Sequence, residues 1–151
     1  MKIEAPKKIF IVDDEELNLK YLKRILSDDY EITTTTNSGN SLELIKEVKP
    51  DIILLDVHMP VINGFELCKL ILDDDDTKNI PVIILSSKED AEVKSDTFAN
   101  GANDYLVKLP EPIELIARIR AHTRHYLSTK QRNEAYEAMR IMQEQLAEAN
   151  S

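Results

Sequence analysis

The chain has 151 residues, with 28 acidic against 19 basic side chains and a formal net charge of −9. This length fits one domain with a short appendage, and the acidic balance disfavours a generic nucleic-acid-binding surface, which needs cations to neutralise phosphates. The 3 glycines form neither GxGxxG nor GxxxxGK[ST], and the single cysteine, Cys68, excludes a disulfide framework and a Cys-rich zinc site. Without a signal-peptide pattern or an 18-residue apolar stretch, we expect a soluble cytoplasmic protein with no membrane partner.

Five short segments are predicted as β-strands. Three of them are continuous apolar runs, which are typical of strands buried on both faces of a parallel sheet. The second segment in chain order is rich in β-branched but polar residues, which favours an edge position in the sheet. In chain order the predicted strands are 9–12, 31–35, 52–55, 82–85 and 105–107.

Apolar residues at helical spacing fill the gaps between these strands. Helices are predicted over 17–26, 42–48, 65–72 and 90–99, and a fifth begins at Pro112, a residue suited to a first helical turn. The order is βα repeated five times. This alternation predicts an α/β fold with a doubly wound parallel five-stranded sheet and helices on both faces.

The tail after about residue 127 carries no strand pattern. Residues 113–151 contain no Gly and no Pro, and a helix from Pro112 to Asn150 would be roughly 58 Å long, more than a globule of this size covers. We therefore divide the chain into a domain at 6–127 and a helical linker or stalk at 128–151. A heptad-like seam in this segment predicts a possible coiled coil. The alternative interpretation is a frayed, disordered tail. The seam residues are Ala135, Met139, Met142, Leu146 and Ala149.

Polar or charged residues follow four of the predicted strands. Because ligands bind at the carboxyl ends of the strands in an open α/β sheet, we expect these side chains to gather in one crevice. They are Asp13 and Asp14 after the first strand, Asp56 after the third, Ser86 and Ser87 after the fourth, and Lys108 after the fifth.

Three carboxylates in one crevice repel one another. A pair of like charges about 4 Å apart costs about 4 kcal/mol at an effective dielectric near 20, so the site requires a cation or a proton. Oxygen ligands without His or Cys favour a hard ion, Mg²⁺, with Mn²⁺ as a substitute. With Lys108 and Ser86 nearby, the fitting chemistry is transfer of a phosphoryl group to a carboxylate.

These residues make the sequence resemble the receiver domain of two-component response regulators. Four pieces match in order and spacing over about residues 6–127: Ile11-Val12-Asp13-Asp14, the run Asp-Val-His-Met-Pro-Val-Ile-Asn-Gly at 56–64, Ser86-Ser87, and Gly-Ala-Asn-Asp-Tyr-Leu-Val-Lys at 101–108. The resemblance implies a flavodoxin-like, CheY-like fold with strand order 2-1-3-4-5, here with an extended C-terminal helix.

The resemblance implies roles for the acidic residues. Asp56 is the expected phosphoacceptor. Asp14 and Asp56 are expected to bind Mg²⁺ directly, together with the backbone carbonyl of His58, while Asp13 binds it through water.

The resemblance also implies a switch. Ser86 is expected to hydrogen-bond a phosphoryl oxygen and to move on activation, and Lys108 to pair with the phosphoryl group. Tyr105 is the expected switch aromatic, which swings inward when Ser86 moves. His58 and Lys88 occupy positions that tune dephosphorylation in this family.

One turn departs from the common pattern. Most receivers place proline directly after the lysine, following a cis bond, whereas this chain reads Lys108-Leu109-Pro110, so the cis or trans state of Leu109-Pro110 is open. This turn and residues 113–126 resemble a subset of receivers attached to diguanylate cyclase (GGDEF) output domains. We expect the chain to be the front part of such a regulator, with the output domain absent.

The expected function is therefore phosphorylation-dependent signalling. The partners would be a sensor histidine kinase or phosphotransfer protein, a C-terminal output domain and a second copy paired through 113–150, without direct nucleic-acid contact. The chain itself would be no enzyme beyond Mg²⁺-dependent self-phosphorylation and dephosphorylation, although its full-length parent would be a diguanylate cyclase.

Three alternatives compete with this interpretation. An aspartate-nucleophile phosphatase would need an aspartate where His58 stands. A degenerate receiver that acts by protein contact alone would not need the complete set of acids, Ser86 and Lys108. A flavodoxin-like cofactor binder would place a phosphate where residues 13–16 repel it.

Overall fold

The computed structural model describes residues 7–87 and 96–150. Five parallel strands form one sheet in the order β2-β1-β3-β4-β5, which confirms the predicted fold class and the edge position of the second strand. The strands are β1 (Lys7–Val12), β2 (Tyr30–Thr35), β3 (Ile52–Asp56), β4 (Val82–Ser86) and β5 (Asp104–Val107).

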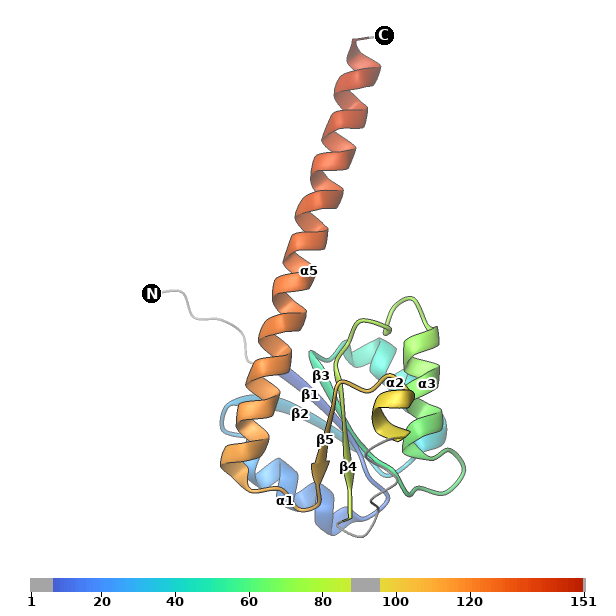
Figure 1. Ribbon diagram of the computed structural model, residues 1–151, viewed down its shortest axis with the longest axis vertical. Helices are drawn as coiled ribbons and strands as arrows, with labels where there is room; N and C mark the ends of the chain where they lie inside the picture. The colour runs from blue at the N-terminus through green and yellow to red at the C-terminus, as the bar shows by residue number, and fades with distance from the viewer. Residues whose placement is uncertain (1–6, 88–95, 151) are drawn as a thin grey trace.

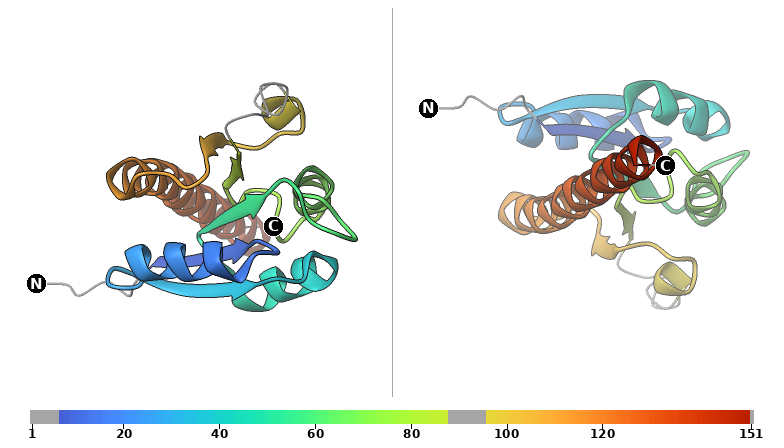
Figure 2. Two further views of the ribbon diagram at one scale, coloured as in Figure 1. Left: turned by 90° about the horizontal axis from the view of Figure 1, so that it is seen from below. Right: turned by 90° about the horizontal axis from the view of Figure 1, so that it is seen from above.

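Helices cover both faces of the sheet. Seen end-on, α1 and α5 lie on one side and α2 and α3 on the other (Figure 2). The helices are α1 (Glu16–Leu26), α2 (Ser41–Val48), α3 (Gly64–Asp73) and α5 (Pro112–Ala149). Residues 96–99 are also helical, while the rest of the helix predicted over 90–99, and Lys88, lie outside the described residues.

The core has two layers because successive residues of a strand point to opposite faces of the sheet. In β1, Phe10 packs toward α2 and α3, whereas Ile9 and Ile11 pack toward α1 and α5. The central strands are buried on both faces, which explains their unbroken apolar sequences. These buried strands form the rigid base on which the polar residues at their carboxyl ends are mounted.

Helix α5 extends far beyond the sheet (Figure 1). Leu115, Ile119 and Thr123 are buried, but residues 128–150 are all exposed. Pro112 occupies the start of the helix, as predicted. The 38 residues of α5 correspond to about 57 Å at the usual rise per residue.

The turn before α5 contains a cis peptide bond between Lys108 and Leu109. Within residues 7–87 and 96–150, no other peptide bond is cis, so the Leu109-Pro110 bond left open by the sequence is trans. Over the same residues, no helix has both the length and the apolar character that crossing a membrane requires.

Candidate functional site

The register of the sheet places the predicted site residues side by side. Val12 pairs with Leu55, so the next residues, Asp13 and Asp56, are neighbours at the carboxyl edge. On the other side of β3, β4 pairs with β5 so that Ser86 lies beside Val107, the residue before Lys108. Asp56 and Ser86 are the last residues of β3 and β4. Each of these strands is therefore one residue longer at its carboxyl end than the sequence predicted.

The predicted acids do converge. Asp13, Asp14 and Asp56 each offer a carboxylate oxygen, and these oxygens all lie within 4.8 Å of one another. Asp13 and Asp56 are buried, while Asp14 is exposed and faces solvent. A set of carboxylate oxygens that is closed on one side and open on the other suits a hard divalent cation that keeps some of its waters.

Lys108 lies against the two buried acids. Its Nζ is 2.7 Å from Oδ1 of Asp56 and 3.1 Å from Oδ2 of Asp13. The lysine side chain is itself 17% exposed, so both ion pairs are largely shielded from water. Lys108 therefore offsets part of the acidic charge and holds a cationic donor directly beside Asp56.

Burial and the neighbouring charges shift the pKa values of Asp56 and Lys108. Burial, reinforced by the neighbouring charge of Asp13, raises the pKa of Asp56 to about 6 although Lys108 opposes the shift. Burial would lower the pKa of Lys108, but the hydrogen bond and charge of Asp56, with Asp13, outweigh burial and raise it. Asp56 thus requires more positive charge than Lys108 supplies, which a divalent cation would provide.

The loop after β3 closes tightly behind Asp56. The Gly64 N–H donates to the carbonyl of Val57 at 2.9 Å, and a Cβ at Gly64 would lie 2.2 Å from the carbonyl oxygen of Asp56. Asn63 and Glu66 form a capping box that starts α3 at this point. The Asn63-Gly64 turn therefore shapes the site without contributing a reacting group.

The remaining predicted residues occupy different positions around the cluster. Ser86 is buried, and its carbonyl accepts a 2.6 Å hydrogen bond from the N–H of Lys108. Tyr105 is half-buried and packs against the core on the α2 and α3 side. The side chain of His58 is exposed in the loop after β3, and Ser87 is exposed after β4.

Three supporting hydrogen bonds of Asp13 were not predicted. Asn18 in the first turns of α1 donates from Nδ2 to Oδ2 of Asp13 at 3.2 Å, and the Asp13 N–H donates to the carbonyl of Thr35 at 3.2 Å. The Asp13 carboxylate also accepts from the N–H of Glu15 at 2.9 Å. The only indication of the Asn18 contact in the sequence was a polar residue five positions after Asp13. The contact to Thr35 depends on the pairing of β1 with β2.

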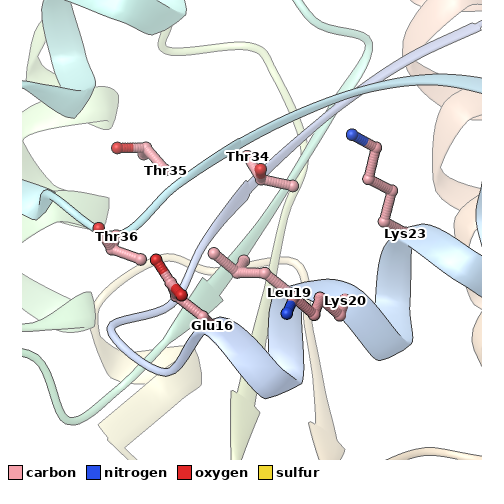
Figure 3. Close-up of a pocket in the computed structure, with 7 residues that line it drawn as sticks. All are labelled: Glu16, Leu19, Lys20, Lys23, Thr34, Thr35 and Thr36. Atoms are coloured by element: carbon pink, nitrogen blue, oxygen red, sulfur yellow. The ribbon is translucent and has the colours of Figure 1, made fainter.

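A separate pocket lies between α1 and β2 and contains none of the predicted site residues (Figure 3). It has a volume of about 500 Å³ and is lined by residues such as Lys20, Lys23 and Thr34. This pocket is therefore distinct from the site predicted at the carboxyl edge of the sheet.

Known proteins resemble this chain over the region that carries the site. The family model for the response regulator receiver domain matches residues 9–120. Protein RcaC from Microchaete diplosiphon is 38% identical over 117 residues, which are 77% of this chain and 18% of that protein. Response regulator PleD from Caulobacter vibrioides is 35% identical over 121 residues, which are 80% of this chain and 27% of that protein.

A solved structure extends the likeness to three dimensions. Chemotaxis protein CheY4 from Vibrio cholerae has a TM-score of 0.72 and 30% sequence identity, and the match covers 78% of this chain and 98% of that one. The chain thus spans less than a third of RcaC and PleD but corresponds to nearly all of CheY4. With the family model matched over most of its length, this chain belongs to the response regulator receiver domains of two-component systems.

Proposed function

We propose that this chain is a phosphorylation-dependent signalling domain in which Asp56 accepts a phosphoryl group from a histidine kinase or phosphotransfer protein. The observation that carries the proposal is the position of Asp56. Its carboxylate is buried, adjoins the oxygens of Asp13 and Asp14, and lies 2.7 Å from the ammonium of Lys108.

The proposed reaction is a simple displacement at phosphorus. A carboxylate oxygen of Asp56 forms the new P–O bond, the P–N bond of the donor phosphohistidine breaks, and its electron pair returns to the imidazole nitrogen. Bound Mg²⁺ would neutralise charge on the acids and the phosphoryl oxygens. Asp14, Asp56 and the backbone carbonyl of His58 would hold the ion directly, with Asp13 acting through water.

Two further residues would handle the product. Lys108 would transfer its ion pair from the Asp56 carboxylate to a phosphoryl oxygen, which requires little movement because its Nζ already lies beside Asp56. Ser86, at the end of the adjoining strand, would donate its hydroxyl to another phosphoryl oxygen. Its displacement would leave room for Tyr105 to swing inward from its half-buried position.

The proposal is tested by incubation with acetyl phosphate and Mg²⁺. We expect the intact mass to rise by one phosphoryl group, and we expect EDTA to prevent the rise because the three acids cannot accept a dianion without a cation. A control with EDTA and excess Mg²⁺ should restore the reaction. Absence of labelling under all conditions would instead favour a degenerate receiver that acts by protein contact alone.

The rest of the chain would serve as a connector. We propose a receiver domain at 6–127 and a helical stalk at 128–151 that leads to an output domain. The Lys108-Leu109-Pro110 turn, through its resemblance to receivers linked to GGDEF domains, supports a diguanylate cyclase as that output. We also predict that this chain does not contact nucleic acid directly.

The exposed seam of α5 would pair with a second copy. Met139, Met142 and Leu146 are each more than half exposed, although they are large apolar side chains at a and d spacing. We expect the double substitution Met142→Lys and Leu146→Lys to lower the dimer fraction at least about fivefold, because like charges would face each other across the seam. The measurement is light scattering across a concentration series, with and without beryllofluoride as the phosphoryl mimic.

The matched control is Ala147→Lys, which adds a charge outside the seam on the same exposed stretch. It should leave the dimer fraction unchanged. A wild-type chain that scatters as a monomer in both states would remove the pairing model.

A further inference from the structure

The carboxylate of Asp13 has polar partners at both of its oxygens. Oδ1 accepts a hydrogen bond from the N–H of Glu15 at 2.9 Å. Oδ2 accepts one from Nδ2 of Asn18 at 3.2 Å and lies 3.1 Å from Nζ of Lys108. Because Asp13 is only 1% exposed, these protein groups rather than bulk water set the rotation of its carboxylate.

The amide of Asn18 faces Asp13 with its nitrogen. Besides Oδ2 of Asp13, Nδ2 has Oε2 of Glu15 at 3.4 Å as a second acceptor. Both neighbours are carboxylates, which accept hydrogen bonds and donate none when they are ionised, so the nitrogen of the amide must point toward them. The two hydrogens of Nδ2 serve both acceptors, and the shorter contact is the one to the buried acid.

Helix α1 fixes the position of Asn18. The Asn18 N–H donates to the carbonyl of Glu15 at 3.1 Å where the helix begins, and the next residue, Leu19, is buried in the core. The side chain of Asn18 is itself half-buried. A donor that is mounted on a packed helix holds its partner more precisely than a donor on a loop does. Asn18 is therefore placed to orient Asp13.

Asn18 and Lys108 differ in charge and in their part in the proposed reaction. Lys108 also contacts Oδ1 of Asp56 at 2.7 Å, and in that reaction it transfers its ion pair to a phosphoryl oxygen. Asn18 would remain on Oδ2 of Asp13 throughout. Because its amide is neutral, Asn18 orients the carboxylate without offsetting the negative charge that attracts a cation.

We propose that Asn18 is a positioning residue for the cation site and strengthens the binding of a divalent ion through Asp13. By holding Oδ2, it keeps the carboxylate in the orientation in which oxygens of Asp13, Asp14 and Asp56 lie within 4.8 Å of one another. Hydrogen-bond partners of the groups around a metal commonly change its affinity by about 10- to 100-fold. The use of the ion in phosphoryl transfer rests on the proposed function, whereas the effect of Asn18 on ion binding does not.

The test is titration of the full chain with Mn²⁺ at about pH 7.5, with the free ion measured by electron paramagnetic resonance. We expect Asn18→Leu, which has a similar shape but no donor, to raise the Kd for Mn²⁺ about tenfold. The matched control is Asn133→Leu, the same change on the exposed stretch of α5, which should bind Mn²⁺ like the wild type. An unchanged Kd for Asn18→Leu, or an equal loss of affinity in the control, would overturn the proposal.

Labelling with acetyl phosphate over a series of Mg²⁺ concentrations separates positioning from a merely structural role. For Asn18→Leu, we expect the half-saturating Mg²⁺ concentration to rise about tenfold, while the rate at saturating Mg²⁺ stays within about twofold of the wild type. A variant with a damaged fold would lose the maximal rate instead, and that result would also overturn the proposal.

The two hypotheses fail in different ways. A wild-type chain that takes up no phosphoryl group, together with weakened Mn²⁺ binding in Asn18→Leu, would refute the proposed function alone. Normal phosphoryl uptake by the wild type, together with unchanged Mn²⁺ affinity in the variant, would refute the role of Asn18 alone.

Discussion

The substitution Asp56→Asn should reduce phosphoryl uptake to below about one hundredth of the wild-type level. The amide has nearly the shape of the carboxylate, but it is a poor nucleophile and carries no negative charge to hold a cation. Asp13 and Asp14 would remain, yet neither is both buried and placed 2.7 Å from Lys108. The measurement is intact mass after incubation with acetyl phosphate and Mg²⁺.

The matched control is Asp75→Asn, the same chemical change at a residue whose side chain is 95% exposed. It should label like the wild type. Continued labelling of the Asp56→Asn protein would contradict the assignment of the phosphoacceptor.

The stability of the Asp56→Asn protein shows whether loss of labelling reflects unfolding. The folded-state pKa of Asp56 is raised to about 6, so ionisation of this carboxylate costs folding free energy as pH rises from about 4 to about 6, and the whole cost is present above that range. Without metal at about pH 7.5, the asparagine variant should therefore be more stable than the wild type, by on the order of 1–3 kcal/mol. The gain should shrink as pH falls toward 5, where the wild-type carboxyl takes up its proton. Denaturant titration at both pH values measures it.

Much of this site could be predicted from sequence because parallel strands end at one edge. Each of the buried strands has an apolar sequence with a polar residue at its carboxyl end, and that arrangement alone places Asp13, Asp56 and Ser86 together. Lys108 follows the last strand for the same reason. The structure confirms the convergence of the acids and adds the lysine distances, which no pattern in the sequence encodes.

The contacts that were missed depend on how separate elements dock. Arg118 and His122 reach Asp104 only because α5 lies over β5 in one particular position, and their separations of 14 and 18 residues follow no local periodicity. Asn18 was missed for a related reason, since its contact with Asp13 depends on the angle at which α1 leaves β1.

The closeness of Gly64 to the backbone of Asp56 was also invisible in the sequence, where Asn63-Gly64 indicated only a turn. The glycine begins α3, and its packing brings the helix against the strand end that carries Asp56. A methyl group at position 64 would clash with the carbonyl oxygen of Asp56. The nearest atoms are backbone atoms of Asp56 and Val57, which cannot rotate away as a flexible side chain can.

Gly64→Ala should therefore lower the free energy of unfolding by about 3 kcal/mol, near the upper end for overpacking, and should reduce phosphoryl uptake because the loop behind Asp56 must shift. Gly39→Ala is the matched control. Its new Cβ would meet a side-chain oxygen of Asn37 at 3.2 Å, with no backbone atom among its nearest neighbours. This control should change stability by less than about 1 kcal/mol and leave uptake unchanged. Denaturant titration and labelling of both variants decide the question, and equal stability of the two would show that the contact behind Asp56 relaxes without cost.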